Sequence, residues 1–62
     1  MRTVSKAEFE TFINANCPNH ARLEPRVERD VEYSYECFDD DDGNEIAFIS
    51  YKTNEEPVYS IR

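Results

Sequence analysis

The apolar residues of this chain change their spacing once, from the period of a helix to the period of a β-strand. Phe9, Phe12 and Ile13 follow the i, i+3, i+4 pattern of one helix face. From Ala21 onward the period is two: apolar residues at odd positions from Val27 to Cys37 alternate with polar or charged ones, as in a strand with one buried face. One such change within 62 residues predicts a single domain over 1–62 with an α+β fold.

The start of the helix carries two independent signals. Ser5 can accept a hydrogen bond from the amide of Glu8, and Glu8 can reach back to the amide of Ser5, so that the pair forms a capping box. Val4 and Phe9 flank this box as a hydrophobic staple. The helix should end near Asn16, because a proline follows two residues later and the residue before a proline disfavours helical geometry.

Three strands are expected after the helix. The first begins near Val31, the central one covers 45–51 with apolar residues on both faces, and 57–62 forms an edge strand, where an initial proline is tolerated. The segment 21–27 is expected to be irregular or to add a short edge piece. The predicted architecture is therefore one N-terminal helix packed on a three-stranded antiparallel β-meander.

The turn between the first two strands, 39–44, allows two registers. A two-residue turn would place Tyr35 opposite Ser50, whereas a three-residue loop with Gly43 in the left-handed conformation would place Tyr35 opposite Ile49. We predict the second register, because it gathers an apolar ladder on one face and cross-strand apolar pairs stabilise a sheet.

The two cysteines and the lack of a long apolar segment suggest the compartment. A small chain that relied on disulfides would usually carry more cysteines, so Cys17 and Cys37 are expected to be free thiols, with Cys37 a small buried residue. No run approaches the roughly 20 apolar residues of a membrane span, and no secretory signal stands at the N-terminus. A cytoplasmic location is expected.

Enzymatic and calcium-binding chemistry are disfavoured. When Gly43 is aligned with the glycine of an EF-hand loop, Phe38 and Ile49 occupy positions that require carboxylates. No nucleophile motif, glycine-rich loop or cofactor fingerprint is present. We expect a protein that is not an enzyme and that has no cofactor and no bound metal.

A small metal site is kept as an alternative. Cys17, His20 and Cys37 could supply three ligands, one fewer than the four nitrogen or sulfur ligands of a structural zinc site.

The strongest remaining signal is charge. The chain carries 14 acidic and 7 basic residues, for a net charge of −7, which disfavours direct binding to nucleic acid phosphates. The basic residues Arg22, Arg26 and Arg29 alternate with acidic ones and are more typical of ion pairing. The acidic residues either keep the protein soluble or form a binding surface.

If they form a binding surface, it is expected on the hairpin 36–45, with the stretch 28–32 beside it, because carboxylates on an extended chain recur at a spacing comparable to that of phosphates. The predicted partner-binding residues are Glu28, Asp30, Glu32, Glu36, Asp39, Asp40, Asp41, Asp42 and Glu45.

In size, acidity, initial Met1 and the plan of one helix on a meander, the chain resembles phage-encoded inhibitors of bacterial defence, namely anti-CRISPR proteins and DNA-mimicking antirestriction proteins. The resemblance implies a non-enzymatic protein of the host-cell cytoplasm. A monomer or a weak homodimer is expected, the dimer by strand addition at an exposed edge. The protein would mask the basic nucleic-acid groove of a protein complex such as a CRISPR effector.

The alternative function is a regulatory or antitoxin-like module that binds its partner through an apolar edge rather than through charge. A short exposed edge strand is a ready surface for strand pairing. That edge would use Tyr51, Val58, Tyr59 and Ile61.

Overall fold

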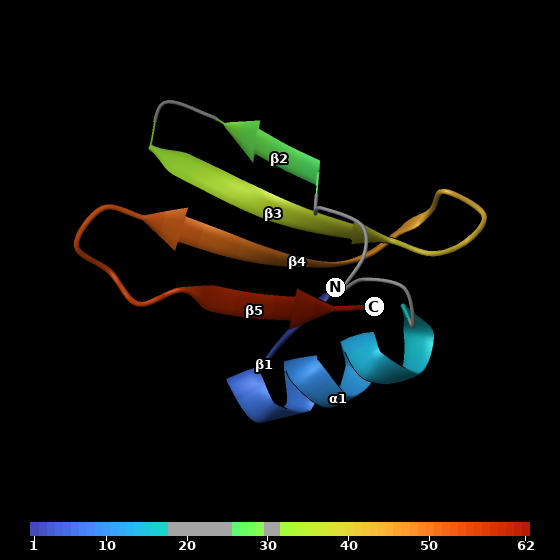
Figure 1. The fold of residues 1–62 in the computed structure, drawn as a ribbon. Coiled ribbons are helices and arrows are strands. Elements are labelled where there is room, and N and C mark those ends of the chain that lie inside the picture. The colour runs from blue at the N-terminus through green and yellow to red at the C-terminus, as the bar shows by residue number, and fades with distance from the viewer. Residues whose placement is uncertain (18–25, 30–31) are drawn as a thin grey trace.

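The computed structural model describes residues 1–17, 26–29 and 32–62, which form one helix and one antiparallel sheet of five strands (Figure 1). The elements are β1 (Arg2–Val4), α1 (Lys6–Asn16), β2 (Arg26–Arg29), β3 (Tyr33–Asp39), β4 (Glu45–Lys52) and β5 (Val58–Ile61). The strand order is β1-β5-β4-β3-β2. The predicted α+β class, with an N-terminal helix on an antiparallel sheet, is confirmed.

The helix begins and ends where the sequence predicts. The Ser5 hydroxyl accepts a hydrogen bond of 3.1 Å from the amide of Glu8, and α1 ends at Asn16. The other half of the predicted capping box is wrong, because the Glu8 carboxylate accepts a hydrogen bond of 2.9 Å from the Arg2 guanidinium instead. This ion pair joins the first turn of α1 to β1.

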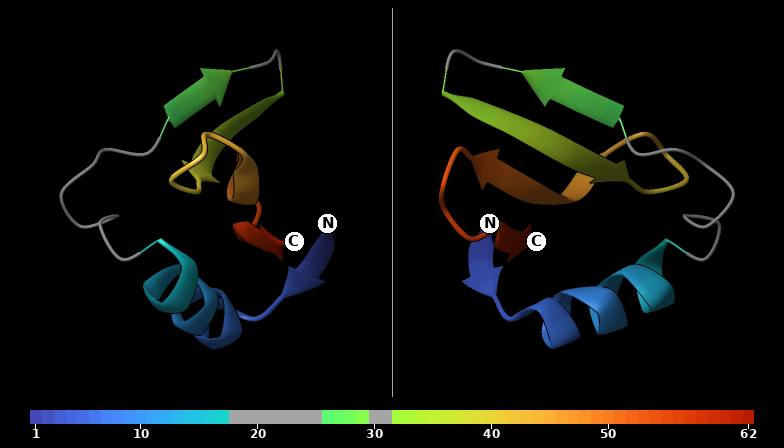
Figure 2. Two further views of the ribbon diagram at one scale, coloured as in Figure 1. Left: turned by 90° about the vertical axis from the view of Figure 1, so that its right-hand side faces the viewer. Right: turned by 60° about the vertical axis from the view of Figure 1, so that its left-hand side comes forward.

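The hydrophobic core lies between α1 and one face of the sheet (Figure 2). Phe9 is only 4% exposed and lies between two rings, those of Phe38 at 5.5 Å and Tyr59 at 5.2 Å between centroids. Such edge-to-face and tilted contacts are preferred arrangements of aromatic pairs. The buried members of the core cluster are Phe9, Ile13, Cys17, Ile46, Ala47, Ile49 and Ile61.

The predicted number of strands is wrong, because two short strands extend the β3-β4-β5 meander at its edges. β2 is the short edge piece considered for 21–27, displaced to Arg26–Arg29. β1 pairs with β5, from Arg2 opposite Ile61 to Val4 opposite Tyr59. Its three residues are too few to show a period of two, and its pairing makes β5 an internal strand rather than the predicted edge strand.

The register between β3 and β4 also differs from the prediction. The loop itself is as expected: Gly43 has a φ of +84°, and Asp39 is opposite Glu45. The pairing then shifts by one residue, so that Phe38 is opposite Ala47. Ile46 is the extra residue of a β-bulge, and beyond it Tyr35 lies opposite Ser50.

The bulge explains which side of β3 faces the helix. It allows two consecutive residues, Ile46 and Ala47, to enter the core with 0% exposure, which a regular strand cannot achieve because its side chains alternate between faces. Phe38 packs on Phe9, so the even-numbered positions of β3 face α1. Tyr33, Tyr35 and Cys37 therefore lie on the opposite side, together with Phe48 of β4. The one helix among the described residues does not cover this side, and we call it the open face.

Candidate functional site

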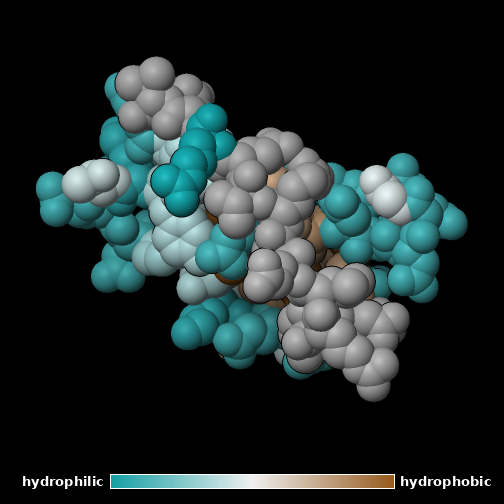
Figure 3. All heavy atoms as spheres, turned by 45° about the horizontal axis from the view of Figure 1, so that its top comes forward, coloured by the Kyte–Doolittle hydropathy of each residue, from teal (hydrophilic) through white to brown (hydrophobic). Residues whose placement is uncertain are grey.

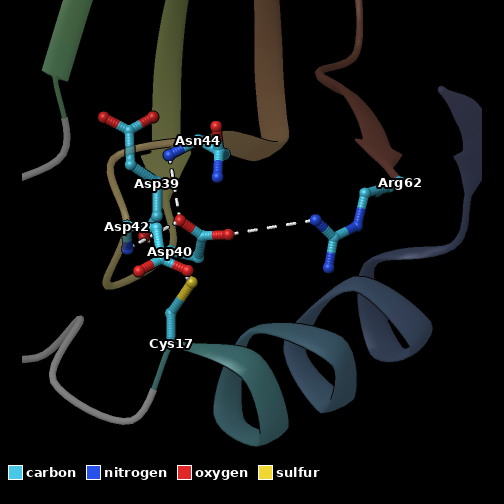
Figure 4. Close-up of polar contacts among 6 residues, drawn as sticks. All are labelled: Cys17, Asp39, Asp40, Asp42, Asn44 and Arg62. Carbon is cyan, nitrogen blue, oxygen red and sulfur yellow. Dashed lines mark hydrogen bonds and ion pairs between the residues drawn. The ribbon is translucent and has the colours of Figure 1, made fainter.

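Five of the predicted partner-binding residues, Asp39–Asp42 and Glu45, lie together at the turn between β3 and β4, and we call this group the acidic tip. Asp40 organises it (Figure 4). Its Oδ1 accepts hydrogen bonds of 2.9 Å from the amides of Asp42 and Asn44. Its own amide donates to the Asn44 carbonyl oxygen at 2.8 Å, and its carbonyl oxygen accepts from the Gly43 amide at 3.0 Å. Asp40 therefore holds the loop closed through both its side chain and its backbone.

The end of the chain supports the same loop. Asp40 Oδ2 lies 3.9 Å from Arg62 Nη1, and the Arg62 amide donates to the Ile46 carbonyl oxygen at 2.8 Å (Figure 4). The pKa of Asp40 is lowered, mainly by the hydrogen bond from the Asn44 amide. Partial desolvation opposes this shift, and the hydrogen bond from the Asp42 amide and the charge of Arg62 add to it. Asp40 therefore stays ionised and keeps its role as an acceptor.

Cys17, at the end of α1, lies against the loop. Its Sγ donates a hydrogen bond of 3.5 Å to the Asp39 carbonyl oxygen (Figure 4). Burial raises the pKa of the Cys17 thiol, and the nearby carboxylates of Asp40, Asp41 and Asp39 raise it further, because both effects disfavour the thiolate. Cys17 is therefore a neutral packing residue and a poor nucleophile.

The acidic tip presents its other carboxylates to solvent. Asp39, Asp41, Asp42 and Glu45 are exposed, whereas Asp40 is half-buried. Figure 3 shows hydrophilic atoms at the right-hand end of the molecule, where Figure 1 places this loop. The arrangement combines one inward carboxylate that holds the turn with several outward ones at its surface.

The predicted ladder of carboxylates along the first strand is wrong at Glu36. This residue is on the helix side of β3, is half-buried, and accepts a hydrogen bond of 2.9 Å from the Tyr51 hydroxyl. A solvated row along one face was inferred from the even-numbered acidic residues. That inference failed because the even-numbered face of β3 packs toward the helix.

The rest of the ladder is not continuous either. Val27 is opposite Glu36, and Glu28 is opposite Tyr35, so Glu28 and Glu36 occupy positions on different faces of the sheet. Glu32 is exposed just before β3, and the predicted contact Asp30 lies outside the described residues.

The arrangement of the two cysteines does not support the alternative metal site. Cys17 belongs to the core on the helix side, whereas Cys37 is on the open face, so the sheet separates them. Both are buried, and neither forms a disulfide. His20 and Arg22 lie outside the described residues, and among the residues that are described no three potential ligands lie close enough to hold a metal ion.

The strand on which the alternative function relies, β5, does not lie at an edge of the described sheet. β5 is flanked by β1 and β4, Ile61 is buried, and Tyr59 packs against the core. Only Val58 among these strand residues is exposed.

Sequence reasoning did not predict that aromatic residues would lie on the open face. Tyr33 and Tyr35 were expected to point into an apolar ladder, but they are half-buried on the side away from α1, as is Phe48. The alternation of the sequence shows that these residues share a face; it contains no signal for which face the helix covers.

No family model, curated protein or solved structure matches this chain. Within the part of the chain that the structure describes, no helix has the length and apolar character needed to cross a membrane.

Proposed function

We propose that this protein is a non-enzymatic inhibitor that binds the basic groove of a nucleic-acid-handling protein and masks it. The contact is the acidic tip, and the partner is a protein of the type of a CRISPR effector or a restriction enzyme. The observation that carries this proposal is the Asp40 network, because it holds a turn whose other carboxylates are exposed.

Two physical effects support a binding role for this arrangement. A net charge of −7 steers a small protein toward a basic surface and raises the rate of encounter. A turn that is already closed by its own hydrogen bonds loses little conformational freedom when it binds, which favours affinity. A flexible acidic loop would have the first advantage without the second.

The experiment uses the tagged protein to capture partners from bacterial lysate at low salt, followed by elution with duplex DNA and mass spectrometry. The test variant is Asp41→Asn with Asp42→Asn, which leaves Asp40 and the turn in place. The matched control, Glu10→Gln with Glu56→Gln, removes the same amount of charge from exposed positions outside the tip.

We expect DNA to release a nucleic-acid-binding protein from the original chain and from the control. Capture by the tip variant should fall at least tenfold. Addition of the original chain should then inhibit DNA binding by that purified partner. Equal capture by the tip variant, or a captured protein that duplex DNA does not release, would overturn the proposal.

A further inference from the structure

The acidic tip holds the only glycine of the chain, Gly43, directly after Asp42. In an Asp-Gly pair the backbone nitrogen of the glycine can attack the carboxyl carbon of the aspartate side chain, since glycine has no Cβ to obstruct the approach. Asp42 is exposed, and a Cβ added at Gly43 would meet nothing within 4 Å. The two reacting groups are therefore neighbours at an open position of the loop.

The side chain of Asp42 takes no part in the network that closes the loop. Its carboxylate makes no hydrogen bond or ion pair with the residues that the structure describes. The Asp40 carboxylate, in contrast, accepts hydrogen bonds from two amides and lies 3.9 Å from Arg62 (Figure 4). Asp42 can therefore turn its carboxyl group toward the Gly43 nitrogen, whereas Asp40 is held in place.

The backbone of the same pair is restrained by Asp40. The Gly43 amide, which is the nucleophile, donates to the Asp40 carbonyl oxygen at 3.0 Å, and the Asp42 amide donates to Asp40 Oδ1 at 2.9 Å. Attack requires the Gly43 amide to give up both this hydrogen bond and its proton. The closed loop therefore opposes the reaction, which proceeds from a locally opened state.

We propose that Asp42-Gly43 is a site of aspartate isomerisation and that Asp40 controls its rate. The Gly43 nitrogen forms a bond to Cγ of Asp42, and the carboxyl OH leaves with the amide proton as water, which gives a cyclic imide. Water then adds to one of the two imide carbonyl carbons, and the bond from that carbon to the nitrogen breaks. Cleavage at Cγ restores aspartate, whereas cleavage at the former backbone carbonyl carbon leaves isoaspartate of the same mass.

Isoaspartate would alter the acidic tip, whether or not the tip binds a partner. The main chain then runs through the Cβ and Cγ of residue 42 and is one carbon atom longer. The hydrogen bonds that close the loop join Asp40, on one side of this linkage, to Gly43 and Asn44 on the other. The added carbon changes the distance that they span, so the modified loop should lose part of its network. Isomerisation is therefore a slow, built-in limit on the lifetime of the closed tip.

The test incubates the intact protein at mildly acidic pH and follows isoaspartate by proteolysis and electron-transfer fragmentation in a mass spectrometer. The peptide acetyl-Asp-Asp-Gly-Asn-amide, which carries residues 41–44 without the rest of the loop, sets the time scale. We expect isoaspartate to accumulate at residue 42 of the folded protein at least threefold more slowly than in the peptide. Asp41 is an internal control, because it is followed by Asp42 and not by glycine.

Three variants test the role assigned to each residue. Asp40→Ala should raise the rate at least threefold, and Asp40→Asn, which keeps one acceptor oxygen, should give a rate in between. Gly43→Ala should lower the rate at least fivefold in spite of its looser turn, because the new Cβ obstructs the nitrogen. Glu56→Gln removes an exposed carboxylate outside the tip and should leave the rate unchanged. A dispersed amide spectrum shows that each variant is folded.

Three outcomes would overturn the inference. The first is no isoaspartate in the folded protein by the time that the peptide has reached equilibrium. The second is equal accumulation at residues 41 and 42. The third is an equal rate in the original chain and in folded Asp40→Ala, which would show that Asp40 does not control the reaction. None of these measurements involves a partner, so the capture experiment succeeds or fails independently of them.

Discussion

The Tyr51 hydroxyl donates a hydrogen bond of 2.9 Å to Glu36 Oε1, diagonally across β3 and β4. Ser34 is directly opposite Tyr51, and Ile49 is opposite Glu36. Burial raises the pKa of Tyr51 to about 12, and the bond to the Glu36 carboxylate contributes in the same direction. The bond satisfies a half-buried carboxylate that would otherwise weaken the helix side of the sheet.

Replacing Tyr51 by Phe should lower the free energy of unfolding by about 1.5 kcal/mol, because a hydrogen bond to a charged group is lost while Glu36 stays half-buried. Urea unfolding followed by circular dichroism measures the change. Tyr33→Phe is the matched control, since the structure shows no hydrogen bond from the Tyr33 hydroxyl to a described residue, and it should change stability by less than about 0.5 kcal/mol. Equal effects of the two substitutions would contradict the role of the bond.

The hydrogen bond between Tyr51 and Glu36 also predicts that the free energy of unfolding falls at alkaline pH. The pKa of Tyr51 is about 12 in the folded protein against an ordinary value of 10.0, so the unfolded chain loses this proton first as the pH rises. The stabilisation is fully present below pH 10 and disappears between pH 10 and pH 12. The stability difference between the original chain and Tyr51→Phe should therefore shrink over this interval, and a constant difference would refute the assignment.

Replacing Asp40 should loosen the acidic tip. Asp40→Ala removes the acceptor for the amides of Asp42 and Asn44, so both amides should exchange with deuterium faster than in the original chain. Asp40→Asn keeps one acceptor oxygen and should give intermediate exchange rates. The pKa of Asp40 is lowered in the folded protein, so its contribution is present above its ordinary value of 3.8 and is lost as the pH falls through the folded value.

At Gly43 there is room for a side chain, but the left-handed backbone conformation disfavours residues other than glycine. An added Cβ would meet nothing within 4 Å, while the φ of +84° is unfavourable for residues other than glycine. Gly43→Ala should therefore lower the free energy of unfolding by about 1 kcal/mol, and Gly43→Asn by less, because Asn adopts this conformation more readily. Thermal unfolding of both variants tests this order, and the reverse order would show that contacts rather than backbone conformation decide.

The aromatic contacts of Phe9 should be essential for folding. Phe9→Ala should destabilise the protein by about 3–5 kcal/mol, a large share of the roughly 3–9 kcal/mol expected for a domain of this size. The half-buried Phe12 lies at the edge of the same core, and Phe12→Ala should cost less. The comparison is made by urea titration, and a folded Phe9→Ala protein of unchanged midpoint would contradict the proposed centre of the core.

Local features were predictable because they depend on residues close together in the sequence. The cap at Ser5 needs only the amide of Glu8, and the helix end needs only the proline after Cys17. The loop with Gly43 in the left-handed conformation follows from the same short-range chemistry. Clustering of the aspartates at that loop was predictable for the same reason.

Other features depend on contacts between distant segments. β1 is stabilised by pairing with β5, at the other end of the chain, and nothing in its three residues indicates a strand. The bulge at Ile46 exists only in the pairing of β4 with β3. Because of it, Tyr35 lies opposite Ser50 and not, as predicted, opposite Ile49. The same shift moved Glu45 next to Phe48.

The sequence by itself determined the helix, the acidic turn and the net charge, because capping, turn geometry and composition are local properties. Only the tertiary structure decided which side of β3 faces the core. Both sides carry rings, Phe38 on one and Tyr33 and Tyr35 on the other, so alternation alone does not distinguish them. Phe38 packs on Phe9, and the bulge buries Ile46 and Ala47 in succession. This arrangement removes the most apolar surface from water and leaves the two tyrosines on the open face.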